Sequence, residues 1–353
     1  MKSSFYKPSL TVFTSVLMGF NYNASAQSNI TVFGAIDTAL RYSTNQNGDG
    51  GNLAEVGSGA ANVNRFGVSG EEDLGAGLKA NFMLDAGFNS ATGESGDGGK
   101  LFSRQAWVGL SGTYGAVTAG RQFSPVYNAQ WAIEPFGWAN LTESGFIYDN
   151  YAGDIHWDNS LMYSGTYGDF TGVLMVGMGE KAGDSKAWRN VGGSLAYASG
   201  LFTAIAAYQE VRNTDAVIAN KVWNVGGSYN IKPVQLFFGY LNYRSDLALQ
   251  KNHVFDLGFI YSMTPKIDLI GAYYHDRQRA EDGRKNTVAG MLKYSFTPRT
   301  AIYIQTDYSK IDAGYVNNIS DQYAFPSTRD ADNNLTSFVS SRASVSIGLR
   351  HIF

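Results

Sequence analysis

Cysteine is absent from this chain of 353 residues, and only 7 prolines occur in it. Without cysteine the fold cannot depend on disulfide bonds. No stretch of proline, glycine and serine divides the chain, which favours one domain although the length alone would suit about two. Basic residues are not in excess either, since 27 Lys and Arg stand against 30 Asp and Glu. A nucleic-acid-binding protein would show a basic stripe or a strongly basic domain, so we expect no nucleic-acid partner.

Long hydrophobic runs are also missing, apart from a short one near the N-terminus. The apolar residues 10–20 follow two lysines and precede the small residues 24–26 (Ala-Ser-Ala). This order is typical of a secretory signal peptide, which we assign to residues 1–26. An N-terminal membrane anchor is the alternative, but the run is too short to span a bilayer as a stable helix. We therefore expect the protein to be exported.

After the signal peptide, apolar and polar residues alternate one by one over much of the chain. In residues 78–88, Phe82 and Leu84 share one face, and Lys79 and Asp85 share the other. A period of two indicates β-strands. A sheet over a soluble core is the alternative, but it would not need every polar face to be matched by a face so rich in Phe, Leu, Val and Gly. The pattern favours a transmembrane β-barrel, whose strands alternate lipid-facing and lumen-facing residues.

Sixteen such strands are predicted, and the connections between them alternate between short and long. The first begins at residue 29, and the others span residues 64–73, 78–88, 101–111, 116–123, 157–166, 170–179, 188–198, 201–212, 221–231, 234–244, 253–263, 266–278, 285–296, 300–311 and 342–353. Residues 46–62 and 312–340 are expected to be polar loops. Short turns at one end and longer loops at the other are typical of bacterial outer-membrane barrels. An even number of strands lets the first and last pair and removes the open edge, and sixteen strands enclose a bore wide enough for water. We therefore predict an all-β fold over residues 27–353, a 16-stranded antiparallel transmembrane β-barrel.

Tyrosines gather near the ends of the predicted strands, as the aromatic girdles of such barrels require. They are Tyr42, Tyr163, Tyr197, Tyr208, Tyr229, Tyr240, Tyr243, Tyr261, Tyr273, Tyr294 and Tyr308.

One stretch, residues 124–157, interrupts the succession of strands and turns. It is rich in aromatic residues and carries Glu134, Glu143, Asp149 and Asp154. A long loop of this kind inside a strand meander is usually functional. We expect it to fold into the lumen and, with arginines on the facing wall, to control what passes.

Several runs of residues resemble one family closely. The run NRFGVSGEEDLGAGLKA at residues 64–80 is similar to the second strand, turn and third strand of the general porins of Gram-negative bacteria, of the β-proteobacterial type. Residues 101–110 (LFSRQAWVGL) and 119–122 (AGRQ) resemble the strands that follow in that family, and the first strand and the terminal aromatic residue match as well. The resemblance implies a homotrimer of sixteen-stranded barrels, each a water-filled diffusion pore whose third external loop folds inward. It also implies contact with the lipid bilayer and lipopolysaccharide of the outer membrane, and recognition of Phe353 by the barrel-assembly machinery.

Strand parity places a set of basic residues on the inner face of the barrel. They are Arg41, Arg65, Arg104 and Lys79. Inward arginines on adjacent strands repel each other and cost stability unless their field is needed. In the family, such a cluster faces acids of the inward loop across the narrowest section. Glu134 opens the run EPFG, which resembles the loop-tip motif, and Asp149 and Asp154 are further candidates. Charge and pore diameter would then select solutes. The alternative is that the arginines pair with loop acids merely to hold the loop in place.

Arg121 differs from the other arginines because it shares parity with Val117 and Ala119, so it would point outward near a strand end. A charge that faces lipid is costly. A contact between subunits of the trimer would relieve this cost, and a local β-bulge that reverses the parity is the alternative.

Features of an enzyme are weak in this chain. Its 4 histidines lack metal-ligand spacing, and no nucleophile elbow occurs, so we expect no catalytic residue, metal or cofactor. His275 and Asp276 come nearest to an acid–base pair, and an outer-membrane hydrolase on a barrel scaffold is the corresponding alternative. A substrate-specific porin is another alternative, with Tyr127, Trp131 and Trp138 as a surface on which one class of solute stacks.

The total charge does not determine the ion preference. The signal peptide holds two lysines and no acid, so 27 − 2 = 25 basic residues of the mature chain stand against 30 acidic ones. Lumenal arginines would favour anions locally, and charges near a constriction outweigh distant ones. We expect a passive pore for small hydrophilic solutes and ions, which it selects by size and charge.

Overall fold

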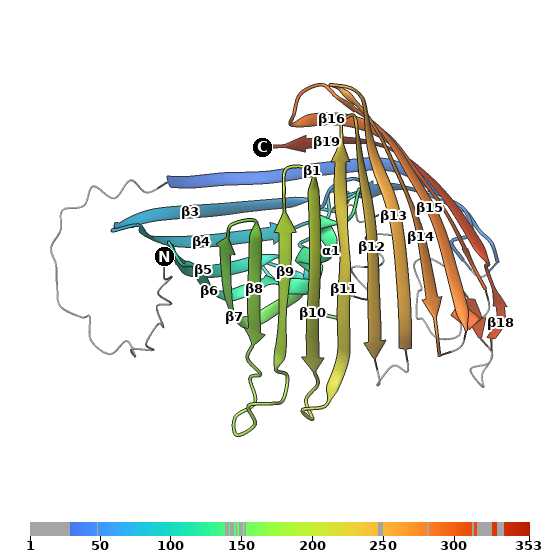
Figure 1. The fold of residues 1–353 in the computed structure, drawn as a ribbon. Helices are drawn as coiled ribbons and strands as arrows, with labels where there is room; N and C mark the ends of the chain where they lie inside the picture. The colour runs from blue at the N-terminus through green and yellow to red at the C-terminus, as the bar shows by residue number, and fades with distance from the viewer. Residues whose placement is uncertain are drawn as a thin grey trace, which may run out of the picture.

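A computed structural model describes residues 29–47, 49–137, 141, 145, 147, 151, 153–245, 250–280, 282–312, 314–315, 327–329 and 335–353. Most of this chain forms one closed antiparallel sheet, seen as a continuous curved wall in Figure 1. The predicted signal peptide lies outside the described residues.

The barrel strands follow one another around the ring in chain order. They are β1 (Asn29–Ser43), β3 (Arg65–Gly75), β4 (Leu78–Gly87), β5 (Gln105–Gly112), β6 (Gly115–Phe123), β7 (His156–Tyr167), β8 (Phe170–Gly177), β9 (Asn190–Ala198), β10 (Phe202–Arg212), β11 (Ile218–Ile231), β12 (Val234–Ser245), β13 (Gln250–Thr264), β14 (Ile267–Gln278), β15 (Gly283–Ser295), β16 (Thr300–Ile311) and β19 (Ser341–Ile352). Each strand pairs with the next, and β19 pairs with β1. The predicted 16-stranded antiparallel barrel is therefore confirmed.

A further strand, β2 (Leu53–Ser58), joins the sheet where the sequence predicted only a polar loop. It pairs with residues 38–43 of β1, beyond the part of β1 that pairs with β3. The loop prediction over residues 46–62 was wrong here because glycine and asparagine surround a strand of only 6 residues. Residues 312–340 likewise contain a small hairpin of β17 (Ser327–Arg329) and β18 (Leu335–Phe338).

The seam between the first and last strands reaches the final residue of the chain. Gly34 donates its N–H to the carbonyl of Phe353 at 2.9 Å, and Phe353 donates to the carbonyl of Gly34 at 3.0 Å. A side chain at position 34 would collide with the phenyl ring, because a Cβ there would lie 2.4 Å from Phe353 Cζ. Glycine at this position therefore lets the terminal ring lie flat against β1.

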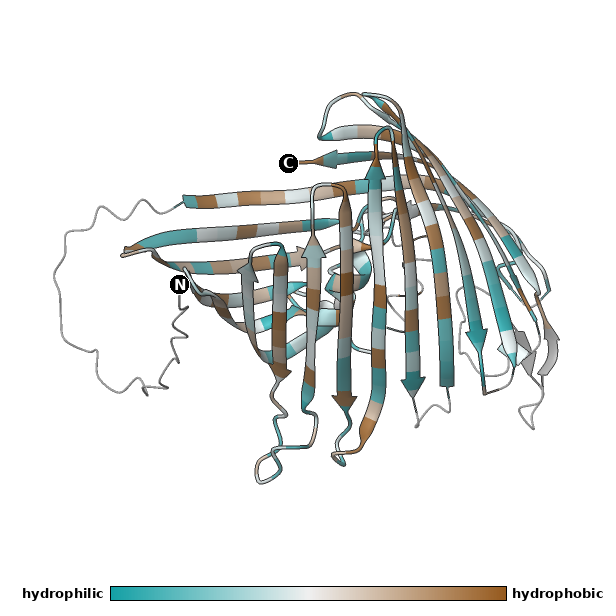
Figure 2. Cartoon of the chain, viewed as in Figure 1, coloured by the Kyte–Doolittle hydropathy of each residue, from teal (hydrophilic) through white to brown (hydrophobic). Residues whose placement is uncertain are grey.

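Hydrophilic and hydrophobic residues alternate along many of the strands, as the bands in Figure 2 show. On β19, Ile347 and Leu349 are 60% and 54% exposed, whereas Ser344 and Ser346 on the other face are buried. The outer surface therefore suits lipid, as a transmembrane strand requires. Most of the predicted girdle tyrosines are on this surface, but Tyr243 was wrongly assigned to it. Tyr243 points inward and is buried, and its ring lies 5.3 Å from that of Tyr151.

The lumen holds α1 (Pro125–Ala132), which packs against the inner face of β9, β10 and β11 (Figure 1). Apolar residues join this part of the chain to the wall. From the segment these are Val126, Ala129, Phe136, Ile147 and Tyr151, and from the wall they include Val222, Leu241, Val254, Ile270 and Met291. The lumen is thus partly filled by a hydrophobic cluster. No helix among the described residues is long and apolar enough to cross a membrane.

Candidate functional site

Arg65 of β3 and Arg104, which directly precedes β5, share one buried carboxylate. Arg104 Nε lies 3.1 Å from Asp85 Oδ2, and Arg65 Nη1 lies 3.9 Å from the same oxygen. Each guanidinium also lies over an aromatic ring, Arg65 over Phe33 at 5.6 Å and Arg104 over Phe123 at 5.0 Å. These contacts offset the repulsion between the two arginines, because each cation faces a negative charge and a ring face. We term these three charged residues the Asp85 cluster.

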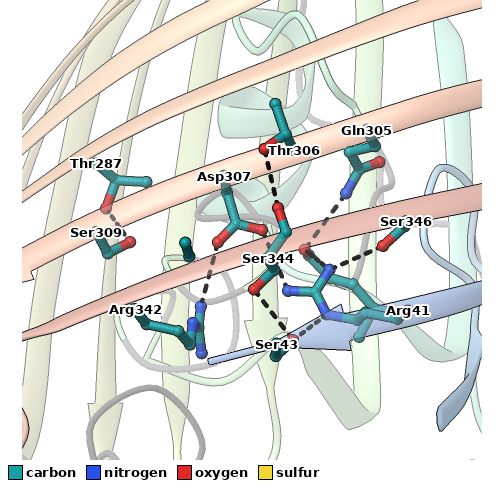
Figure 3. Close-up of polar contacts among 12 residues, drawn as sticks. Arg41, Ser43, Thr287, Gln305, Thr306, Asp307, Ser309, Arg342, Ser344 and Ser346 are labelled. Carbon is teal, nitrogen blue, oxygen red and sulfur yellow. Dashed lines mark hydrogen bonds and ion pairs between the residues drawn. The ribbon is translucent and has the colours of Figure 1, made fainter. Parts of the chain in front are cut away.

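A second group has the same arrangement across the seam of the barrel (Figure 3). Arg41 Nη2 lies 3.1 Å from Asp307 Oδ1, and Arg342 Nη2 lies 3.7 Å from Asp307 Oδ2. Arg41 also donates to Ser346 Oγ at 3.2 Å and to the carbonyl of Leu141 at 3.1 Å. The last contact binds the inward segment to β1 through its backbone. We term Arg41, Arg342 and Asp307 the Asp307 cluster.

Each cluster, as defined by its three described residues, contains two guanidinium groups and one carboxylate, which is an excess of one positive charge among these residues. The sequence predicted that Arg41, Arg65 and Arg104 face inward, which the structure confirms, but it assigned their counter-charges to the inward loop. Among the described residues, the acids that pair with them are Asp85 and Asp307 of the wall. Strand parity places both acids inside, so parity was the signal that could have found them.

The inward segment begins with a helix whose start is specified locally. Ser124 Oγ accepts the N–H of Tyr127 at 3.4 Å, and Pro125 occupies the first turn, where a missing N–H costs nothing. The wall supplies another acceptor, because Gln209 Oε1 on β10 receives the N–H of Val126 at 3.1 Å. The helix N-terminus is therefore fastened to the barrel.

The tip of the segment rests on glycines of the wall. A Cβ at Gly226 of β11 would lie 2.4 Å from Ile133 Cδ1, and one at Gly258 of β13 would lie 2.5 Å from Pro135 Cγ. Close approach of another part of the chain is a common reason for glycine within a strand. These two positions hold the tip closer to the wall than an alanine would allow.

Glu134, the acid predicted to face the arginines, is directed to the wall. Its Oε1 accepts the hydroxyl of Tyr274 on β14 at 2.5 Å and the N–H of Phe136 at 3.2 Å, and the residue is only 4% exposed. These contacts fasten the tip to β14.

Comparison with known proteins identifies the family. Residues 14–314 match the family model of the Gram-negative porins. The chain belongs to this family. An outer membrane porin protein of Bordetella pertussis is 29% identical over 262 residues, which cover 64% of this chain and 66% of that protein. Outer membrane porin protein 32 of Delftia acidovorans is 28% identical over 302 residues, which cover 79% of this chain and 83% of that protein.

Solved structures show the same fold. The anion-selective porin from Comamonas acidovorans superposes with a TM-score of 0.76 at 24% identity, over 93% of this chain and all of that one. The trimer form of OmpT from Vibrio cholerae gives a TM-score of 0.67 at 14% identity, over 92% of this chain and 99% of that one. With its apolar exterior and outer-membrane relatives, the porin is placed in the outer membrane.

Two of the other predicted lining residues can be located. Lys79 of the porin pairs with Glu71 at 2.6 Å beside the β3–β4 turn, and both side chains are nearly half exposed. It lies six residues along β4 from Asp85, which corresponds to about 20 Å in a strand, so Lys79 is not part of the Asp85 cluster. Asp154 is exposed. Asp149 lies outside the described residues.

Arg121 has a partner within its own chain. The β6–β7 register shifts between Gly120 and Gln122 because β7 has one extra residue there. Thr118 and Gln122 are both buried, so this bulge does not reverse the parity of Arg121. Arg121 Nη1 lies 2.6 Å from Asp158, and Lys100 lies 2.7 Å from the same carboxylate. The cost of an outward arginine is therefore relieved without a second subunit.

Of the two described members of the proposed stacking surface, only one is accessible. Tyr127 is 5% exposed and stacks on Phe123 at 4.8 Å, whereas Trp131 is 42% exposed. Trp138 lies outside the described residues. A solute in the lumen can therefore reach Trp131 but not the ring face of Tyr127.

His275 and Asp276 point to opposite faces of β14. His275 Nδ1 contacts Asn286 Oδ1 at 2.8 Å, whereas Asp276 is completely buried inside the barrel. Adjacent positions of a strand cannot direct both groups at one substrate. Among the described residues, no group of three or more His, Asp or Glu could hold a metal ion.

Asp276 has another role that the sequence did not indicate. It accepts the hydroxyl of Tyr151 at 2.5 Å, the hydroxyl of Tyr315 at 2.9 Å and the amide of Asn252 at 2.8 Å. Tyr151 comes from the inward segment and Tyr315 from the chain after β16. One wall carboxylate thus holds two separate lumenal segments, an arrangement that we term the Asp276 latch.

Proposed function

We propose that this porin is a passive diffusion pore for small hydrophilic solutes and ions, and that its lumen favours anions. The observation that carries the proposal is the positive excess of the Asp85 and Asp307 clusters on one side of a closed barrel. The inward segment packs mainly against the wall from β9 to β14 and reaches Arg41 at the Leu141 carbonyl. We propose that solutes pass between this segment and the two clusters.

The arrangement supports selection by a fixed field. Each shared carboxylate holds two guanidinium groups in place, so their charge does not move away when a solute passes. An anion near the clusters is attracted and a cation is repelled, over a range set by the Debye length of about 10 Å at 0.1 M salt. The acidic residues of distant loops are screened at that range. The solved Comamonas porin of similar fold is described as anion-selective, which agrees with this preference.

We assign the constriction to Arg41, Arg65 and Arg104, with Arg342 as a fourth arginine. Glu134 fastens the segment tip rather than balancing the arginines, and Asp149 and Asp154 stay predictions. Arg41 serves both roles considered for the arginines, since it also binds the segment backbone.

The assembly follows from the family resemblance. We propose a homotrimer in contact with lipid and lipopolysaccharide, inserted by the barrel-assembly machinery through Phe353, after removal of a signal peptide at residues 1–26 from the barrel domain 27–353. We propose no enzymatic activity, since the side chains of His275 and Asp276 diverge.

The reversal potential in planar bilayers tests the proposal. Purified protein should produce ohmic conductance steps, commonly in threes. Under a potassium chloride gradient, the sign of the reversal potential should indicate chloride preference. Trimers that never conduct would contradict the pore, and a potential of cation-selective sign would contradict the role of the two clusters.

A further inference from the structure

One lumenal arginine stands apart from both clusters, near the short-turn end of the barrel. Arg350 lies inward on β19, in register with Asp37 of β1 and Ala301 of β16. It borders two adjoining spaces in the lumen, of about 130 Å³ and about 450 Å³. The tip residues Pro135 and Phe136 line both spaces. We term the smaller space, with Arg350 at its mouth, the Arg350 recess.

The charge of Arg350 is not compensated by a contact among the described residues. No ion pair or hydrogen bond of its side chain occurs there, and its Nε is buried without an acceptor. Asp37, directly opposite on β1, instead accepts the hydroxyl of Tyr303 at 2.6 Å. Lys293, the other cation of the recess, pairs with Asp268 at 2.9 Å. Arg350 therefore makes no close ion pair among the described residues, although the Asp37 carboxylate attracts it from a longer distance.

Apolar side chains form part of the lining of the recess, beside the polar Lys293 and Tyr303. Ile270, Met291 and Ala301 form the wall, and Phe136 covers it from the segment tip, all of them at most 6% exposed in the folded chain. An ordinary inorganic anion would gain nothing from these side chains. A hydrocarbon group would, because each buried methylene contributes about 0.8 kcal/mol.

We propose that the Arg350 recess binds small organic carboxylates, with the carboxylate on the guanidinium and the hydrocarbon part against Ile270, Met291 and Phe136. Guanidinium forms two parallel hydrogen bonds to a carboxylate, which would supply the acceptor that Nε lacks. The volume of about 130 Å³ equals roughly four water molecules, which suits a short chain or a single ring. The inference deepens the proposed function, since such an anion would pause on its way through the pore.

Equilibrium binding of radiolabelled benzoate to the mature protein in detergent tests the site without any need for conduction. We expect saturable binding at millimolar benzoate, and at least a tenfold loss of affinity in Arg350→Gln. The matched control is Arg299→Gln, which removes an exposed positive charge from the β15–β16 turn at the same end of the barrel and should leave binding unchanged. Met291→Ala should weaken benzoate severalfold and acetate hardly at all, because only the longer anion reaches the apolar wall.

Several results would overturn the site. Equal benzoate affinity of the wild type and Arg350→Gln would show that the guanidinium does not take part in binding. Benzyl alcohol that binds as tightly as benzoate would show that the negative charge of the ligand does not matter. Competition by chloride or phosphate as strong as that by benzoate would show a general anion site. In bilayers, benzoate should reduce the wild-type current saturably. Conducting channels without benzoate binding would refute the recess and leave the proposed pore intact, whereas binding without conduction would refute the pore alone.

Discussion

Neutralising both arginines of the Asp85 cluster should reverse its effect on permeating ions. Arg65→Gln with Arg104→Gln changes the cluster from two positive charges and one negative charge to a lone carboxylate, a change of two charges. At about 6 Å in water, one unit charge acts on a passing ion with about 0.7 kcal/mol, so two act with about 1.4 kcal/mol. Screening at 0.1 M salt reduces this to about 0.8 kcal/mol.

An energy of that size is about a fourfold change in local ion concentration. The local chloride concentration should fall and the local potassium concentration should rise by this factor, so the ratio of the two concentrations at the cluster changes by roughly fifteenfold. The change over the whole pore should be smaller, because the Asp307 cluster and Arg350 remain. We therefore expect the reversal potential under a potassium chloride gradient to move clearly toward potassium.

The matched control keeps the charge and changes the chemistry. Arg65→Lys with Arg104→Lys should leave the reversal potential near that of the wild type. Asp85→Asn added to the double glutamine variant gives a neutral cluster and avoids an unpaired buried carboxylate. Its reversal potential should lie between those of the double lysine and double glutamine variants. A reversal potential that stays within twofold in permeability ratio across these variants would show that the cluster does not face the ion path. Raising the salt to 1 M should shrink all differences, since the Debye length falls to about 3 Å.

Three further changes test how the lumen and the seam are held. Gly258→Ala should push the segment tip away from the wall, at a cost of about 1–3 kcal/mol, and lower the single-channel conductance. Gly172→Ala, whose Cβ would meet nothing within 4 Å, is its control. Asp276→Asn should loosen both latched segments by about 1–3 kcal/mol, seen as greater open-channel current noise. Gly34→Val should displace the ring of Phe353 and lower the temperature at which the barrel unfolds in heat-modifiability gels.

Each of these expectations has a clear opposite. Gly258→Ala and Gly172→Ala with equal conductance would mean that the tip does not border the ion path. Quiet channels from Asp276→Asn would mean that apolar packing alone holds the segments. An unchanged unfolding temperature for Gly34→Val would mean that the terminal ring contributes nothing to closure.

Much of the barrel could be predicted because lipid imposes a strict alternation. One face of every strand must be apolar, and the other may vary, so the ranges of strands such as β12 and β16 follow from a period of two. The lumen imposes no such rule. Tyr243 faces inward because the inward segment supplies an apolar partner for it, and that partner is far away in the sequence. β2 was missed for a related reason, since its 6 residues carry too short an alternation to stand out from their glycine-rich surroundings.

The lining could be predicted by face but not by pairing. Parity correctly placed Arg41, Arg65 and Arg104 inside, yet parity contains no information on which inward acid lies within reach. Asp307 meets Arg41 only because the seam aligns β1, β19 and β16, a register set by the closure of the whole ring. Glu134 was expected to face the arginines because the sequence does not show that the Tyr274 hydroxyl lies within hydrogen-bonding distance of its carboxylate.

The seam also constrains how the protein can assemble. It joins Arg41 to Ser346, which are 305 positions apart in the chain. All other neighbouring barrel strands follow one another in the chain, with only β2 between β1 and β3 and the β17–β18 hairpin between β16 and β19. By the logarithmic law of loop closure, bringing such distant ends together costs about 3 kcal/mol more than closing a hairpin of about a dozen residues. The backbone N–H and C=O groups on one edge of β1 therefore stay unpaired until β19, the last strand to be synthesised, pairs with it. Whatever shields that edge during transit decides whether the chain becomes a cylinder or an aggregate.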